Sequence, residues 1–390
     1  MADHRILLVF SSKWFRVVRP QLDDEVADMC RASPIEMEPG MAHFKKTLAA
    51  FALIPLLVCA ASAQQKYTTS QFVLERLLEG HHVVNVVDDF LIFWDQAKDK
   101  TPKVQRRLWM RLVENKHRAY FDRAVYRTTD PVLRRAMLEE FLIRVPSQVD
   151  AIREFNKTIL NLRTSPLVEV VILFKARFRQ YEQQRSIYIG LSMFRFDGAV
   201  RAVSNDDGVP DTLCLGAEVL SGYSREQIRV AIAHEFFHLY HFSFLFQNPQ
   251  QLAISDIRTP HMTLMIEGMA SAVAEEVFPG EQGGRELYLH FSKDELEAQQ
   301  QDLAQNSSRY LELVRIGAPA EQYSQWFTNS HIGDAPPRGG YLLGYEVTRR
   351  VLASYTLEDM IRMSPAELRE HAEEQLAAMS NERILLMASR

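Results

Sequence analysis

Apolar positions along the chain follow three successive patterns, and each pattern predicts a different kind of element. From about residue 70 to residue 163 they recur every three or four positions, which is the period of amphipathic helices. Thr129-Asp130-Pro131 and Pro146-Ser147 mark helix boundaries inside this region. We therefore expect the N-terminal half of the chain to be mainly helical.

The pattern changes after Ser165-Pro166, where short runs become rich in β-branched and aromatic residues. Such runs favour strands, and we expect three or four strands of one sheet, drawn from residues 167–174, 185–194 and 211–220, with a turn-rich loop at 204–211. Helical spacing then returns, first over 224–246, with breaks at Pro249, Pro260, Pro279-Gly280 and Pro336–Gly340. The order of helices, small sheet and helices predicts an α+β fold with a small mixed sheet.

A candidate export signal lies at residues 41–63. Lys45 and Lys46 precede an apolar run of 13 residues at 48–60, and Ala61-Ser62-Ala63 supplies the small residues of a cleavage site. The run is shorter than the roughly 20 residues that span a bilayer as a helix. We therefore expect no stable transmembrane span, and an exported protein located in the periplasm or outside the cell.

The forty residues before this signal leave two interpretations open. Either Met41 is the true start and residues 1–40 are an artefact of the gene model, or the extension is real and residues 48–60 act as an uncleaved segment. We favour the first interpretation. The mature chain would then begin at Gln64, with a helical region at 64–164 and a catalytic domain at 165–390.

Composition removes several classes of function. The formal net charge is -5, so the chain has no overall basic field of the kind that nucleic-acid-binding proteins carry. The three cysteines, Cys30, Cys59 and Cys214, match no zinc-knuckle, redox or haem spacing. We expect neither a nucleic-acid partner nor cysteine chemistry.

One predicted helix carries residues with metal-site spacing. Ser224 and Gln227 form a capping-box signature at its start. His234 and His238, four positions apart, lie on one face of a helix and can reach a single cation. Glu235 projects beside that cation, where it can accept a proton from water. This spacing predicts a zinc site with one open position for activating water.

A third zinc ligand is expected from a later helix, predicted at 263–280. Glu267 is the only charged residue of that helix before Glu275. A carboxylate in such an apolar stretch must be neutral, paired or bound to a cation. Glu275 and Glu276 are weaker candidates near the polar end. His241 lies one turn beyond His238, and we expect it to pack, to support a ligand or to contact substrate.

His234-Glu235-x-x-His238 followed by Glu267-Gly268-x-Ala270 resembles the gluzincin class of zinc peptidases, and more narrowly the bacterial families of predicted zinc-dependent proteases. The similarity covers roughly residues 165–350. It implies a zincin-like domain in which His234, His238 and Glu267 hold Zn²⁺ and a peptide or protein is the substrate. Glu235 would then act as general base and afterwards as general acid.

The resemblance has two departures. Thermolysin-like enzymes place a histidine-supporting aspartate four residues after the ligand glutamate, and this chain has Ser271 there. No G-x-M-E-N signature of aminopeptidases occurs upstream, so the sequence does not support an amine-anchored exopeptidase.

The sequence does not decide which residue would stabilise a tetrahedral intermediate. Relatives commonly use a tyrosine, histidine or arginine from the C-terminal region. This chain offers four such residues in or near a glycine-rich loop, namely His331, Arg338, Tyr341 and Tyr345. The favoured candidates are the two tyrosines and His331, although Gly340 and Gly344 equally suit close helix packing. Strand residues near Gly190 or Leu213–Gly216 could line an extended peptide.

Two other functions remain open alongside a peptidase. The chain could be a catalytically silent, zinc-stabilised envelope protein that binds peptides or a partner. Alternatively, the N-terminal helices could be the functional binding module beside a vestigial peptidase. Glu235 argues against the silent protein, because a purely structural zinc site has no need of a base.

Overall fold

The computed structural model describes residues 75–76, 78, 80–181, 185–205, 208–246, 255–278, 291–328 and 335–388, without the side chains of Glu275 and of residues beyond 381. The expected signal at 41–63, the two interpretations of residues 1–40, and His331 fall outside these residues. In the part of the chain that the structure describes, no helix is long and apolar enough to cross a membrane.

Helices dominate the chain before residue 178, as the periodicity predicted. They are α3 (Val86–Ala97), α4 (Pro102–Trp109), η3 (Met110–Glu114), α5 (Arg118–Tyr120), η4 (Phe121–Tyr126), α6 (Pro131–Arg144), η5 (Val145–Gln148), α7 (Val149–Ile159) and α8 (Pro166–Arg177). Their apolar faces meet in an aromatic cluster, in which the rings of Phe93, Phe121 and Phe141 each lie 5.4 Å from Trp109. Trp109 is fully buried by these contacts.

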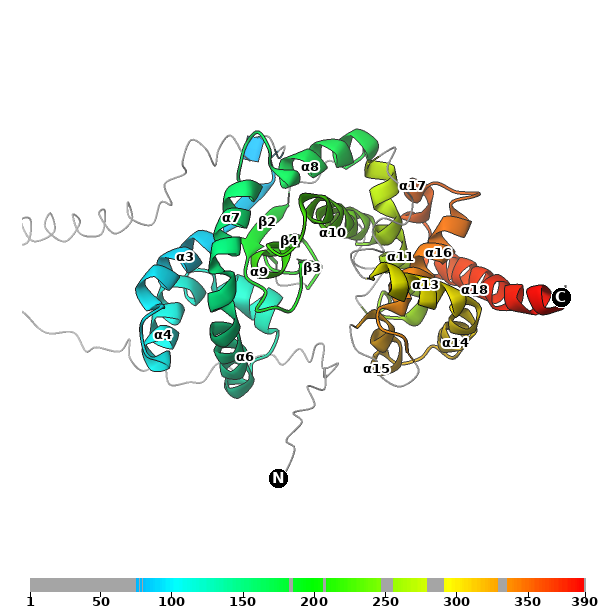
Figure 1. Ribbon diagram of the computed structural model, residues 1–390. Helices are drawn as coiled ribbons and strands as arrows, with labels where there is room; N and C mark the ends of the chain where they lie inside the picture. Colours follow the sequence, from blue (N-terminus) through cyan, green and yellow to red (C-terminus); the bar gives the residue numbers. More distant parts are fainter. Residues whose placement is uncertain are drawn as a thin grey trace, which may run out of the picture. The chain divides into compact units, whose positions relative to one another are not determined.

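A four-stranded sheet has the strand order β1-β2-β4-β3, and Figure 1 shows β2, β4 and β3 beside these helices. Its strands are β1 (His82–Asn85), β2 (Ser186–Gly190), β3 (Gly198–Arg201) and β4 (Thr212–Gly216). β1, β2 and β4 run parallel, whereas β3 pairs antiparallel with β4, with Gly198 opposite Leu215. The prediction of an α+β fold with a small mixed sheet is therefore confirmed.

Two details of the predicted sheet were wrong. Residues 167–174, expected as a strand, lie in helix α8. Ser165 caps that helix by accepting a hydrogen bond from the Val168 amide at 3.3 Å, and Pro166 occupies its first turn. The outer face of α8 carries apolar residues such as Ile172, which is 48% exposed, so the helix lacks a regular polar face and its β-branched run resembles a buried strand.

The second error concerns strands that were missed. β1 lies inside the region expected to be mainly helical, because its short apolar run continues into the helical spacing of α3. β3 has only four residues, too few to show alternation. The expected domain boundary at residue 164 stays a prediction, and β1 from before it pairs with β2 from after it.

Helices α9 to α18 follow the sheet. They are α9 (Ala217–Leu220), α10 (Arg225–Leu245), α11 (Pro260–Val277), α13 (Lys293–Gln301), α14 (Leu303–Ile316), α15 (Ala320–Tyr323), η6 (Ser324–Phe327), α16 (Gly339–Val351), α17 (Leu357–Met360) and α18 (Pro365–Ala388). The predicted capping box of α10 is confirmed, since the Ser224 hydroxyl accepts from the Gln227 amide and the Gln227 side chain accepts from the Ser224 amide. α10 packs against β3, β4, α8 and α11.

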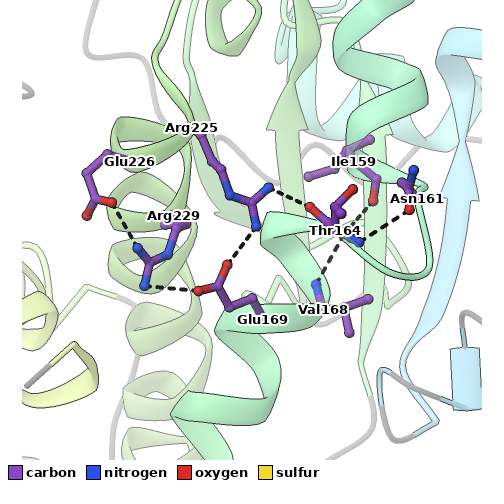
Figure 2. A network of polar contacts seen from close by, with 9 residues as sticks. Ile159, Asn161, Thr164, Val168, Glu169, Arg225, Glu226 and Arg229 are labelled. Carbon is purple, nitrogen blue, oxygen red and sulfur yellow. Dashed lines mark hydrogen bonds and ion pairs between the residues drawn. The ribbon is translucent and has the colours of Figure 1, made fainter.

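Charged contacts join the start of α10 to α8 (Figure 2). Glu169 of α8 accepts hydrogen bonds from Arg225 at 2.8 Å and pairs with Arg229 at 3.1 Å. Arg229 also donates to Glu226 at 2.8 Å. Such partly exposed pairs contribute about 0.2–1 kcal/mol each. These pairs therefore link the start of α10 to α8 and add little to the stability of the fold.

Candidate metal centre

Helix α10 presents two imidazoles at one point. His234 and His238 lie one turn apart, and their side chains are each only 8% exposed. Their Nε2 atoms are 3.0 Å apart, with the rings nearly perpendicular. The surrounding positions of the helix, Ala233, Phe236 and Phe237, are fully buried. Packing therefore fixes the helix so that two nitrogen lone pairs can converge.

Glu267 faces these imidazoles from helix α11. Its Oε2 lies 3.4 Å from the Nε2 of His234 and 3.4 Å from that of His238. Burial opposes the charge on Glu267, but the two imidazoles outweigh burial and hold the pKa of its carboxyl well below its usual value. The only charged residue in an apolar stretch thus meets the two histidines.

The three atoms are spaced for a small transition-metal ion. Sides of 3.0, 3.4 and 3.4 Å define a triangle. The circle through its corners has a radius of about 1.9 Å, slightly shorter than zinc bonds of about 2.0–2.1 Å. His234, His238 and Glu267 would hold such an ion, which would supply a Lewis acid at this point. The donor set and its spacing fit zinc.

Glu235 offers a second carboxylate beside the same imidazoles. A ligand atom of Glu235 lies within 4.8 Å of those of His234 and His238, and this group of three could hold a metal ion. Glu267 is the candidate third ligand, since its Oε2 lies 3.4 Å from both Nε2 atoms. Burial raises the pKa of the Glu235 carboxyl above its ordinary value. A carboxylate that lies beside the two imidazoles and has a raised pKa is suited to proton transfer.

Strand β3 passes directly against Glu235. A Cβ atom built on Gly198 would lie 2.4 Å from the Cγ atom of Glu235, closer than side-chain atoms can pack. Among the described strands, β3 has a neighbour on one side only. The edge of the sheet nearest the candidate site is therefore β3. The residues suggested from sequence, Gly190 and Leu213–Gly216, lie in the inner strands β2 and β4.

Sequence reasoning also missed Asp197, which precedes β3. Its carboxylate accepts a hydrogen bond from the Tyr223 hydroxyl at 2.9 Å, and its backbone oxygen accepts one from the Gly216 amide at 2.7 Å. Its charge contributes to the raised pKa of Glu235. The Asp197-Gly198 pair is a common turn signal and could have indicated that a strand begins there.

The two tyrosine candidates lie in different surroundings. Tyr341, in the first turn of α16, has its ring centroid 6.4 Å from that of His234. Burial, followed by the charge of Glu267, raises its pKa well above the ordinary value, so the phenol stays protonated. Tyr345 packs one turn later in a small apolar cluster with Ala272, Phe291, Leu296 and Leu342. Arg338 precedes α16, and its charge also acts on Tyr341.

Helix α16 packs close to α11, which carries Glu267, because Gly268 and Gly344 lie against each other. A Cβ on Gly268 would lie 2.2 Å from the Gly344 carbonyl oxygen, and one on Gly344 would lie 2.6 Å from the Leu264 carbonyl oxygen. Gly340 likewise admits the ring of Phe327. The close packing expected of Gly340 and Gly344 is thus present, and it also carries Tyr341 toward His234.

The remaining candidates lie away from the convergence point. His241 is fully buried between its helix neighbours, and neither ring nitrogen has a hydrogen-bond partner among the described residues. Burial, with a smaller effect of His238, lowers its pKa to about 3. Glu276 accepts a hydrogen bond from Arg177 at 2.7 Å, so it faces α8. The hydroxyl of Ser271 has no hydrogen-bond partner within the described ranges.

Two buried imidazoles and two carboxylates on packed helices, beside the edge of a mixed sheet, define a candidate metal centre. Residues 182–370 match the model of a family described as "Predicted Zn-dependent protease (DUF2268)". The matched region includes α10, α11 and α16, and the similarity supports a zinc-dependent protease as the class. Searches of the curated proteins and of the solved structures found no match to this chain.

Proposed function

We propose that this chain is a zinc-dependent peptidase of the gluzincin type, in which His234, His238 and Glu267 hold Zn²⁺. The observation that carries the proposal is the convergence of the two Nε2 atoms and the Glu267 oxygen at 3.0–3.4 Å. A zinc ion held there would polarise a peptide carbonyl and lower the pKa of a nearby water molecule to about 7.

Glu235 is the proposed general base and acid. Its carboxylate lies beside the imidazoles, so it can accept a proton from water and return it to the leaving amine. Its raised pKa makes it a better proton acceptor than an exposed glutamate. Tyr341 is the proposed donor to the developing oxyanion, favoured over Tyr345 by its position beside His234. His331 stays a further candidate outside the described residues.

An extended peptide or protein segment is the proposed substrate. β3 offers main-chain groups on its outer side, and a peptide added there would run past Glu235. Export to the periplasm or the exterior, by way of the signal at 41–63, is part of the same proposal and rests on the sequence alone.

Metal content and hydrolysis, measured on the same variants, test this assignment. The mature chain should bind about one zinc ion, and His234→Ala, His238→Ala and Glu267→Ala should each lose zinc and therefore activity. Glu235→Gln should keep zinc and lose about 10²–10⁴-fold in peptide hydrolysis, because the amide cannot act as a base.

Glu276→Gln is the matched control. Glu276 lies on the same helix as Glu267, but its carboxylate faces Arg177 and not the histidines. It should keep both zinc and activity. Absence of stoichiometric metal after zinc is supplied would overturn the metal centre. If Glu275→Ala lost zinc while Glu267→Ala kept it, the third ligand would be Glu275 and not Glu267. A Glu235→Gln variant as active as the parent would overturn the role of Glu235 as general base, and a zinc-bound parent without hydrolysis would favour a silent peptide-binding protein.

A further inference from the structure

Glu218 is a buried carboxylate that the proposed reaction does not use. It lies in α9, directly after β4, and is 2% exposed. Its Oε1 accepts hydrogen bonds from the Ser192 hydroxyl and from the Phe194 amide, each at 2.8 Å. Its Oε2 has no partner in the described part of the chain. Burying a carboxyl group without a cation is costly, so its position calls for a compensating role.

The loop that Glu218 binds, residues 191–197, connects β2 to β3. Met193 and Phe194 have φ values of 54° and 61°, in the left-handed region that disfavours side chains. Two such residues in succession cost roughly 1–2 kcal/mol each. The bond from the Phe194 amide to Glu218 and the bond from the Arg195 amide to the Ser192 hydroxyl hold this turn. The loop therefore keeps its shape because Glu218 fixes it.

The far end of this loop rests against the candidate active site. The Phe196 carbonyl oxygen lies so close to Gly216 that a Cβ there would meet it at 2.2 Å. The Asp197 backbone oxygen accepts from the Gly216 amide, and the next residue, Gly198, touches Glu235. A change in the turn at 192–194 would therefore move β3 relative to Glu235.

We propose that Glu218 is a positioning residue. The hydrogen bonds that it accepts from Ser192 and Phe194 hold β3 in the position where a peptide bound along this strand meets Glu235. This inference rests on the proposed function for its catalytic consequence. The placement of β3 can be measured separately, by hydrogen exchange of the backbone amides in residues 191–201.

Two variants separate the hydrogen bonds from the charge. Glu218→Ala removes both bonds, so the amides of residues 191–201 should exchange faster and kcat should fall about 10- to 100-fold, as expected for a misplaced strand. Zinc content should stay at the parent level, because the proposed ligands His234, His238 and Glu267 lie on α10 and α11 and not on this loop. Glu218→Gln keeps an oxygen at the accepting position, and it should behave like the parent in exchange and in kcat.

Glu114→Ala is the matched control. Glu114 is also buried and accepts two side-chain hydrogen bonds, from Trp109 at 3.1 Å and Tyr126 at 2.9 Å, but it lies in the helical region. This variant should lose stability while keeping the exchange of residues 191–201 and kcat.

The outcomes separate the two proposals. Unchanged exchange in Glu218→Ala, or an equal kcat loss in Glu218→Gln and Glu218→Ala, would overturn the positioning role. A kcat loss of the same size in Glu114→Ala would do so as well, since it would reflect general destabilisation. If the parent protein did not hydrolyse peptides, the proposed function would be refuted. Hydrogen exchange of the amides in residues 191–201 would still decide whether Glu218 holds β3.

Discussion

Gly198→Ala tests the contact between β3 and the proposed base. A Cβ at this position would lie 2.4 Å from Cγ, 3.1 Å from Cδ and 3.3 Å from Oε1 of Glu235. Ordinary contacts of a Cβ atom begin at 3.4 Å, so the two groups must separate by about 1 Å. Either the Glu235 side chain turns away from the imidazoles of His234 and His238, or β3 moves away from Glu235.

Both responses predict the same loss. A displacement of about 1 Å at a reacting group can cost about 10²-fold in rate, which corresponds to about 2.7 kcal/mol of transition-state stabilisation. We therefore expect kcat/KM for a peptide substrate to fall about 100-fold. Overpacking of a well-filled site should also lower the free energy of unfolding by about 1–3 kcal/mol. Zinc content should not change, because the three atoms nearest to the added methyl group all belong to Glu235, which is not a proposed ligand.

Gly222→Ala is the matched control, because a Cβ there would meet only the Val219 carbonyl oxygen, at 3.5 Å. Peptide hydrolysis, zinc content and chemical denaturation should be measured on both variants. The control should match the parent in all three. Parent-like hydrolysis and stability in Gly198→Ala would refute the description of β3 as packed on Glu235.

Two further predictions concern groups outside the centre. Cys214 is fully buried, and burial raises the pKa of its thiol, so it should react with a thiol reagent only after denaturation. Rapid labelling of the native chain from Gln64 would contradict this burial. Burial, with a smaller effect of Arg369, lowers the pKa of His261 from 6.5 to about 4, while the charge of Glu373 and a hydrogen bond with the Pro365 backbone oppose this shift. The Thr259 hydroxyl lies 3.3 Å from its Nε2. Because the unfolded chain takes up this proton first, stability should fall as pH drops from 6.5 toward 4, and His261→Gln should reduce the loss measured between about pH 7 and about pH 5. Equal losses in parent and variant would show that another group dominates.

The sequence was most informative where local chemistry decides the structure. The capping box at Ser224 and Gln227 and the apolar spacing after it predicted helix α10, because these signals act within a few residues. Glu267 could be singled out because a carboxylate in an apolar helix needs a partner. The structure places it against His234 and His238, although its role as a ligand stays a proposal.

Elements set by long-range packing could not be predicted in this way. Helix α8 was mistaken for a strand because its exposed side also carries apolar residues such as Ile172, so its sequence lacks a regular polar face. The roles of Gly198 and Glu218 depend on which residues the folded chain brings beside them. No spacing along the chain encodes the contact between β3 and α10, since it joins segments that are separated by β4 and α9.

The parallel pairing of β1 with β2 has a consequence for how the protein can be divided. The family similarity starts at residue 182, a hundred residues after the strand that completes this side of the sheet. A fragment limited to residues 182–370 would expose the backbone groups of β2 to solvent. Its inner residues Ile187 and Ile189, now fully buried, would then stand at an unprotected edge. Such an edge invites pairing with other chains, so the fragment should aggregate unless it also includes β1 and the helices before residue 182 that pack on the sheet and on α10.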